Sequence, residues 1–212
     1  MSNRPDPTSI ADFSYRYVSV ISFWNHAESA AKQIAQLLLG ESAMSMAVTA
    51  ELGNRTLTQA IEVASHEMGE IGEHLRHFSD GFAILLGYRN FYVHGIYAIR
   101  HDGFVPGSTY GVLFTLDGKG RVRYFNRHLT ITELDATIAA IHSLIGYAAA
   151  IQKELGATGD GLAALIESYK ASLEKPSWPP NVEKTPLYLQ GQEPPPPKPS
   201  RKRETPKKPN PA

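Results

Sequence analysis

Cysteine is absent from this chain of 212 residues. Without thiols the chain has neither disulfide bonds nor cysteine-based nucleophiles, which is usual for proteins of a reducing compartment. The first residues, MSNRPDPTSIADFSYRY, do not follow the positive-then-apolar layout of a secretory signal. No uninterrupted apolar run approaches the roughly 18 residues of a membrane span. We therefore expect a soluble, cytoplasmic protein without a membrane partner.

The chain has no net charge, since 21 basic residues balance 21 acidic ones. The two kinds of residue are not evenly distributed along the sequence, however. Residues 194–212 contain six basic residues and one acidic residue, so this segment carries +5 and the remainder carries −5. Such a segment either holds RNA through phosphate contacts or is a solubilising extension or polyproline ligand. Its basic residues are Lys198, Arg201, Lys202, Arg203, Lys207 and Lys208.

Apolar residues recur at three- and four-residue spacing over most of the chain, which predicts a mainly α-helical fold. Thr130 or Thr132, followed by Glu133, predicts the capped start of the last long helix. We expect a flexible leader over 1–9, a helical domain over 10–175 and a disordered, Pro-rich basic tail over 176–212. The predicted helices cover residues 10–39, 42–50, 56–67, 69–94, 131–155 and 161–173.

One stretch of the chain changes from helical spacing to alternation. The segments IYAIR, YGVLFTL and RVRYFNR alternate as strands do, and Asp117-Gly118-Lys119-Gly120 is typical of a hairpin turn. These patterns predict a small antiparallel β-meander over residues 96–126, inserted between two long helices.

The stretch YRNFYVHGIY, residues 88–97, places three polar side chains at the predicted end of a long helix. Asn90 and His94 are four residues apart and share one face of that helix. Arg89 lies further round, but its long side chain can reach the helix end. A guanidinium binds two phosphate oxygens, and an imidazole exchanges a proton near neutral pH while Asn90 holds one ring nitrogen. The group is therefore typical of phosphate chemistry.

The pattern Arg89-Asn90-x3-His94 resembles the R-x4-H signature of the HEPN superfamily, the higher eukaryote and prokaryote nucleotide-binding domains. A polar residue after the arginine and flanking helices extend the resemblance over about residues 10–155. It implies a HEPN-like helical bundle that acts, without metal or cofactor, as an endoribonuclease in a homodimer with one composite cleft. Arg89 would stabilise the scissile phosphate, His94 would serve as general acid or base during 2′-hydroxyl attack, and Asn90 would orient the pair.

Members of this superfamily differ in what they do. Many are toxins or defence effectors, whereas others have lost activity and bind RNA or protein, and an inactive binding module is the alternative function here. Some relatives carry a tyrosine two residues after the histidine, where a partner enzyme modifies it. Ile96 occupies that position and Tyr97 follows it, which argues against that kind of toxin–antitoxin pairing. An antitoxin or regulatory protein of another kind stays open as a partner.

Three further residues are candidates for contact with RNA. Tyr92 is placed to stack on a base, while Tyr97 and Arg100 follow the motif directly. Arg100 is alternatively a plain strand-end charge. The alternative for the aromatic residues of the motif, Tyr88, Phe91 and Tyr92, is a place in the core or in a dimer interface.

A purely structural role for the motif is the main alternative to catalysis. Arg89 would then pair with a carboxylate such as that of Glu70 or Asp80, and His94 would cap the helix that carries it.

Metal ligation is a second role that histidines commonly have in proteins. The stretch HEMGE, residues 66–70, has Glu70 where a zinc protease needs its second histidine. His74 and His77 lie three residues apart and could ligate a metal with Glu70 or Glu73, but we predict a solvated helix face instead. We predict no required metal.

Overall fold

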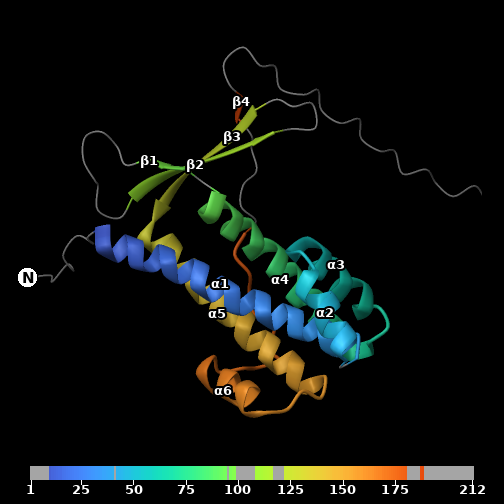
Figure 1. Cartoon of the computed structure of the whole chain (residues 1–212). Helices are drawn as coiled ribbons and strands as arrows, with labels where there is room; N and C mark the ends of the chain where they lie inside the picture. Colours follow the sequence, from blue (N-terminus) through green and yellow to red (C-terminus); the bar gives the residue numbers. More distant parts are fainter. Residues whose placement is uncertain are drawn as a thin grey trace, which may run out of the picture.

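The computed structural model describes residues 10–40, 42–94, 96–98, 108–116, 122–180 and 187–188. As predicted, this part of the chain is mainly helical, and its helices form a bundle (Figure 1). The helices are α1 (Ile10–Leu38), α2 (Ala43–Glu51), α3 (Asn54–Ser65), α4 (Gly69–His94), α5 (Ile131–Glu154) and α6 (Asp160–Ser168).

The centre of the bundle consists of α1, α4 and α5, with α3 packed on α4. Trp24 of α1 meets Phe82 of α4 with ring centroids 4.8 Å apart. Gln152, near the C-terminal end of α5, donates a hydrogen bond of 3.1 Å to the main-chain oxygen of Ala30 in α1. Arg16 of α1 contacts Asp135 of α5, and Phe23 contacts His142, so α1 and α5 run parallel. Tyr17 and Trp24 of α1 contact Tyr92 and Phe82 of α4 in the reverse order, so α4 runs antiparallel to them.

The apolar stripe predicted for α4 forms a central part of the core. Leu75, Phe78, Phe82 and Leu85 are buried at 1% exposure or less. Complete burial of such a side chain contributes about 1.5–3 kcal/mol to the free energy of unfolding. The spacing of these apolar residues in the sequence therefore predicts correctly which side of α4 lies in the core.

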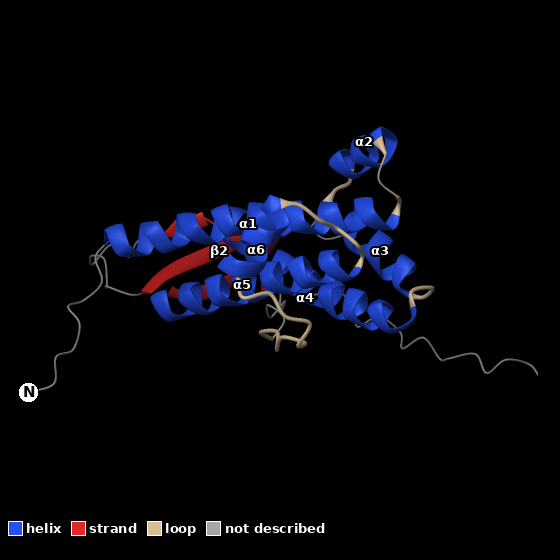
Figure 2. Cartoon of the chain, turned by 90° about the horizontal axis from the view of Figure 1, so that it is seen from below, coloured by secondary structure: helices blue, strands red, loops and turns tan. Residues whose placement is uncertain are grey.

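Helix α5 owes its apolar composition to its central position. By length and composition it passes the test for a membrane-crossing helix, but most of its most apolar window is buried inside the bundle. It packs against α1 on one side and α4 on another, and α6 packs against it as well (Figure 2). Thr130 caps its start, with the reciprocal bonds to Glu133 that the sequence predicted.

A four-stranded antiparallel sheet lies at one end of the bundle. Its strands follow the order β1 (Ile96–Ala98), β2 (Ser108–Leu116), β3 (Val122–Thr130) and β4 (Leu187–Tyr188). Strand β3 continues to Thr130, beyond the end predicted at residue 126, and leads directly into α5. Strand β4 was not predicted, because two residues carry no detectable alternation. The predicted turn at 117–120 lies outside the described residues.

The C-terminal boundaries differ from those predicted. Helix α6 ends at Ser168 instead of continuing to 173, and Lys170 adopts a left-handed conformation with φ +49°. The chain then turns back toward α4, and residues 176–180, predicted as part of a disordered tail, contact that helix. The leader at 1–9 and most of the predicted tail lie outside the described residues.

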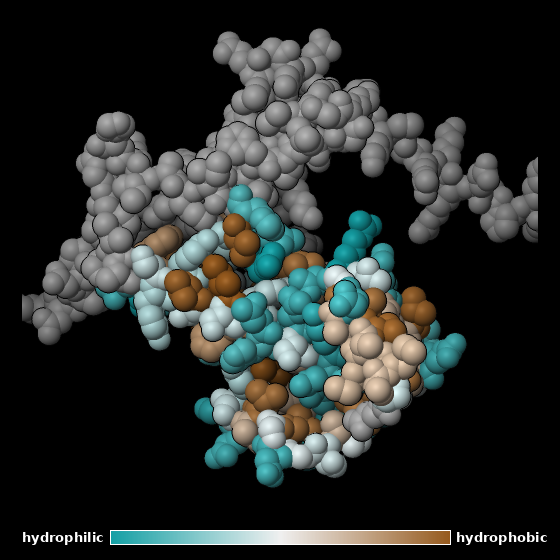
Figure 3. Space-filling model, in the orientation of Figure 1, coloured by the Kyte–Doolittle hydropathy of each residue, from teal (hydrophilic) through white to brown (hydrophobic). Residues whose placement is uncertain are grey.

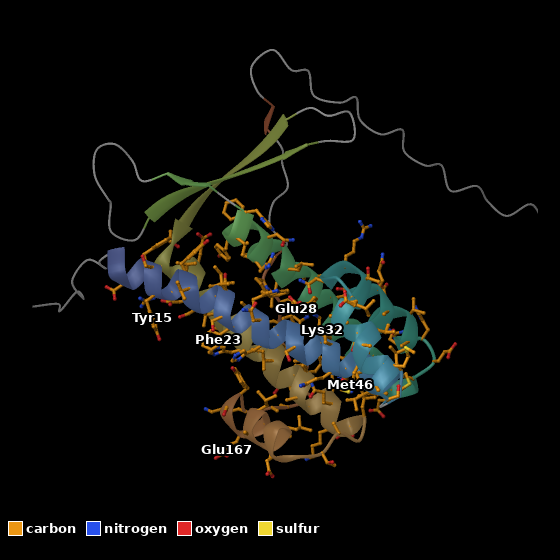
Figure 4. The ribbon with its side chains drawn as sticks, in the orientation of Figure 1. Tyr15, Phe23, Glu28, Lys32, Met46 and Glu167 are labelled. Carbon is orange, nitrogen blue, oxygen red and sulfur yellow. The ribbon has the colours of Figure 1, made fainter. Side chains whose placement is uncertain are left out.

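Helix α2 turns its polar side inward and its apolar side outward. Ser45 and Thr49 are buried, and their hydroxyls donate hydrogen bonds to the main-chain oxygens of Ser42 and Ser45, respectively. Met44 and Met46 are 74% and 57% exposed, and Met46 points away from the bundle (Figure 4). The space-filling view shows the resulting pale and brown surface at the right (Figure 3).

Candidate functional site at the end of helix α4

The last turns of α4 separate buried aromatic residues from the predicted polar motif. Tyr88, Phe91 and Tyr92 are 6%, 3% and 1% exposed, so this side of the helix faces the core. Arg89 is half-buried on a neighbouring side, and His94 is exposed as the final residue of the helix. The core-facing aromatics therefore hold the helix end in a fixed rotation, which leaves the motif at the surface.

Arg89 has no carboxylate partner within the described residues. Its Nη1 donates a hydrogen bond of 3.1 Å to Oδ1 of Asn90, while its Nε is buried without an acceptor in that part of the chain. The predicted alternative, a pairing of Arg89 with Glu70 or Asp80, is wrong. These residues precede Arg89 by about 28 Å and 13 Å along the same helix axis, beyond the reach of the side chains.

Asn90 orients the arginine instead of the histidine. The sequence suggested that its amide would hold one imidazole nitrogen, but its oxygen accepts the bond from Arg89. An amide oxygen facing a guanidinium fixes the plane of that cation without neutralising it. The guanidinium is therefore oriented, partly dehydrated and still fully charged.

His94 occupies the last position of α4, where the carbonyl end of the helix attracts cations. Within the described residues no hydrogen bond reaches its ring. Its exposure leaves the imidazole accessible from solvent, as a group that transfers protons must be.

The end of α4 is held by a residue that sequence reasoning missed. The hydroxyl of Tyr17 in α1 donates a hydrogen bond of 2.7 Å to the main-chain oxygen of Tyr92. This oxygen belongs to the last four carbonyls of α4, which lack partners within the helix. No local signal in the sequence connects two residues 75 positions apart.

Of the three residues predicted to contact RNA, the structure describes the side chain of Tyr92 alone. Tyr92 is a core residue, and its hydroxyl shares a hydrogen bond of 3.0 Å with Thr137 of α5. The prediction that it stacks on a base is therefore wrong, since its ring is not accessible. Tyr97 lies in β1 opposite Gly111, although its side chain is outside the described part, and Arg100 lies outside the described residues altogether.

The histidines at the start of α4 are not on a solvated face, contrary to the prediction. His74 shares a hydrogen bond of 2.7 Å with the hydroxyl of Tyr147, and Nε2 of His77 donates one of 2.7 Å to the main-chain oxygen of Pro176. Burial raises the pKa of Tyr147 to about 12. Within the described residues no group of His, Asp and Glu is arranged to hold a metal.

Comparisons with models of protein families, with characterised proteins and with solved structures found no match to this chain.

Proposed function

We propose that this protein is a metal-independent endoribonuclease of the HEPN type, with Arg89, Asn90 and His94 as its active-site residues. The observation that carries the proposal is the state of Arg89, an oriented cation without a carboxylate partner in the described residues. A structural arginine is normally paired, because a partly buried charge is costly to leave alone. An anionic ligand such as an RNA phosphate would supply the missing partner.

The proposed reaction needs no metal and no cofactor. His94, or its counterpart in a second subunit, removes the proton of the ribose 2′-hydroxyl, whose oxygen attacks the phosphorus. Arg89 binds the non-bridging oxygens as negative charge increases on them. The bond from phosphorus to the 5′-oxygen breaks, and that oxygen takes up a proton. The products are a 2′,3′-cyclic phosphate and a 5′-hydroxyl, so DNA, which lacks the nucleophile, is not cleaved.

A homodimer is part of the proposal, because the resemblance implies one cleft built from two copies of the motif. Apolar side chains near the motif end of the bundle support it. Tyr15 and Val18 in the first turns of α1 are 74% and 61% exposed, and Tyr15 points away from the helix (Figure 4). Tyr17, between them, contacts the end of α4 and so lies on another face of α1. A second copy that packs on α1 would bury Tyr15 and Val18. A cytoplasmic location belongs to the same proposal.

The test is cleavage of RNA in EDTA by the purified protein and by Arg89→Ala and His94→Ala variants. Arg76→Ala and His66→Ala are the matched controls, since both residues are exposed on the bundle surface. Each motif variant should lose at least about 100-fold in rate if the residues stabilise charge or transfer a proton. Equal rates for all five folded proteins would remove Arg89 and His94 from the mechanism.

The second candidate is an inactive HEPN-like module that binds RNA or a protein partner. The missing hydrogen bond to the His94 ring within the described residues favours it, because an unoriented imidazole is a weak general base. In that case RNA is retained without cleavage, and the Arg89→Ala variant loses retention.

A further inference from the structure

Residues 173–180, which we call the C-terminal strap, lie along helix α4 after the chain has left α6 (Figure 1, orange). Nζ of Lys175 lies 3.2 Å from a carboxylate oxygen of Glu73, in the second turn of α4. Farther along the helix, the hydroxyl of Tyr88 donates a hydrogen bond of 2.9 Å to the main-chain oxygen of Pro180. These two contacts are separated by about 22 Å of helix, at about 1.5 Å per residue. The strap therefore accompanies α4 over most of its length.

Trp178 attaches the strap to two helices at once. Its Nε1 donates a hydrogen bond of 3.1 Å to the main-chain oxygen of His77 in α4, and the two rings stack with centroids 5.2 Å apart. The ring of Tyr147 in α5 meets the same indole edge-on, with centroids 6.4 Å apart. Nε2 of His77 also donates a hydrogen bond to the main-chain oxygen of Pro176. The strap is thus held by α4 through main chain and side chains, and it touches α5 as well.

Two glycines inside the long helices lie where the returning chain crosses them. A Cβ at Gly81 of α4 would overlap the indole of Trp178, and a Cβ at Gly146 of α5 would lie 2.7 Å from the main-chain oxygen of Tyr169. Glycine destabilises the interior of a helix relative to alanine, so both positions lose helix stability and gain a close approach. The docked strap is therefore a defined state of the fold.

The strap is attached to the outside of the bundle, so it can leave while the bundle stays folded. None of its residues is fully buried, and neither is any residue of α6. The pair of Lys175 with Glu73 is exposed, and such pairs contribute little to stability. Lys170, between α6 and the strap, has a φ of +49°, which is unfavourable for a residue with a side chain and can relax on release. Local opening of such a segment costs less than global unfolding.

We propose that the strap is a conformational latch for the candidate site. The docked strap fixes the turn of α4 that carries Arg89, through the hydrogen bond from Tyr88 to Pro180, and the released strap leaves a folded bundle with an inactive site. Arg89 follows Tyr88 directly, so a rotation of the helix at Tyr88 turns the guanidinium by the same angle. Tyr88 and Trp178 are positioning residues that act through Arg89. The role of Arg89 in this inference rests on the proposed function.

The first experiment tests the latch without RNA, by hydrogen exchange of the full chain and of Trp178→Ala, measured by mass spectrometry. Amides of residues 86–94 should exchange several-fold faster in the variant, although Trp178 contacts α4 at His77 and Gly81. Helix α3 should exchange equally in both proteins, which shows that the bundle is intact. Unchanged exchange over 86–94 would overturn the inference.

A second variant decides the question if Trp178→Ala loosens α3 as well. Tyr88→Phe keeps the ring in the core and removes the hydroxyl that donates to Pro180. Exchange over residues 86–94 should rise by a smaller factor than in Trp178→Ala. In the double variant Tyr88→Phe should add nothing, because the released strap no longer offers the acceptor. Additive effects of the two substitutions would contradict a path from Trp178 through Tyr88.

The second experiment measures RNA cleavage in EDTA. A displacement of about 1 Å at a reacting group can lower a rate by about 100-fold, so kcat of Trp178→Ala should fall by about 10- to 100-fold. KM should change much less, because a misplaced guanidinium loses more of its interaction with the transition state than with bound RNA. A kcat equal to that of the unmodified chain would overturn the latch.

A reversible bridge then separates the position of the strap from the substitution. The chain has no cysteine, so Glu73→Cys with Lys175→Cys is joined specifically by a bis-maleimide that contains a reducible disulfide. In the Trp178→Ala background the bridge should restore most of the lost kcat, since tethering raises the effective concentration of the strap at α4, and reduction should remove the gain. Bridging Arg76→Cys with Asp80→Cys, both exposed on α4, should restore nothing. A bridged strap that leaves kcat low would contradict the inference.

The latch and the proposed function fail in different ways. If the latch is wrong but the function is right, Trp178→Ala cleaves RNA as the unmodified chain does, and cleavage still depends on Arg89 and His94. If the function is wrong but the latch is right, none of the proteins cleaves RNA, but hydrogen exchange over residues 86–94 still rises in Trp178→Ala.

Discussion

Tyr17 of α1 caps the final turn of α4 by donating a hydrogen bond of 2.7 Å to the main-chain oxygen of Tyr92. The bond joins the helix that begins the fold to the helix that carries the motif, two residues before His94. The position of the imidazole therefore depends on the packing of α1 as well as on α4 itself.

The substitution Tyr17→Phe should loosen this turn while retaining the ring. One net hydrogen bond is worth about 1 kcal/mol, so the free energy of unfolding in urea should fall by about that amount. If the proposed function is right, the rate of RNA cleavage should fall as well, because His94 is less well placed. Tyr15→Phe is the control, since the Tyr15 side chain is 74% exposed and should change neither quantity. Equal stability of the two variants would contradict the capping role.

We expect Arg89 to lower the free energy of unfolding of the protein instead of raising it. Its Nε is buried without an acceptor in the described residues, so Arg89→Met removes a dehydrated donor and keeps the apolar stem. The free energy of unfolding should stay equal or rise, while RNA cleavage or binding is lost. Arg16→Met is the comparison, because Nε of Arg16 lies 2.7 Å from Asp135 and this surface pair should contribute up to about 1 kcal/mol. A clear loss of stability in Arg89→Met would indicate a structural arginine.

Gly81 and Trp178 should show strong coupling in a double-mutant cycle. In the unmodified chain Gly81→Ala forces the indole off α4 and should lower the free energy of unfolding. In a Trp178→Ala background the same change meets no ring, and the better helix propensity of alanine should raise stability by up to about 1 kcal/mol. The sign of the effect therefore reverses. Thermal unfolding of the four proteins measures this coupling, and additive effects would show that the Trp178 indole does not pack on Gly81.

His142 should make the fold sensitive to acid. It packs edge-on against Phe23 at 4.2 Å, and burial lowers its pKa below the ordinary 6.5. The unfolded chain then binds a proton more readily than the folded one, so stability is complete above about pH 6.5 and declines as the pH falls below it.

The measurement compares urea unfolding near neutrality and at about pH 5 for the unmodified chain and for His142→Phe. The substitution should reduce the loss at acid pH, and near neutrality it should not destabilise, because it removes a buried ring nitrogen without a partner in the described residues. His26→Phe, which changes an exposed histidine of the same region, should leave the acid sensitivity unchanged. An unchanged slope in His142→Phe would exclude this residue as its source.

Local pattern was sufficient for several parts of this fold. The spacing of Leu75, Phe78, Phe82 and Leu85 predicts a buried stripe, and the structure buries all of them. Thr130 with Glu133 predicts the start of α5. These features depend on residues within a few positions of one another, whose relative placement follows from the geometry of one helix.

The same reasoning failed where a polar helix face is covered by a distant segment. His74 and His77 are indistinguishable from solvated residues until Tyr147 and Pro176 are found beside them. Tyr92 fits either a substrate platform or the core until Thr137 is found at its hydroxyl.

By itself the sequence determined that the chain is mainly helical, that Arg89, Asn90 and His94 fall at the end of a long helix, and that the positive charge is gathered in one terminal segment. Only the tertiary structure decided that Arg89 lacks a carboxylate partner within the described residues, that Tyr17 caps the helix end, and that residues 175–180 return along α4. The reason is physical. Helix periodicity fixes which side chains share a face, but the partner of each face is chosen by packing between residues far apart in the chain.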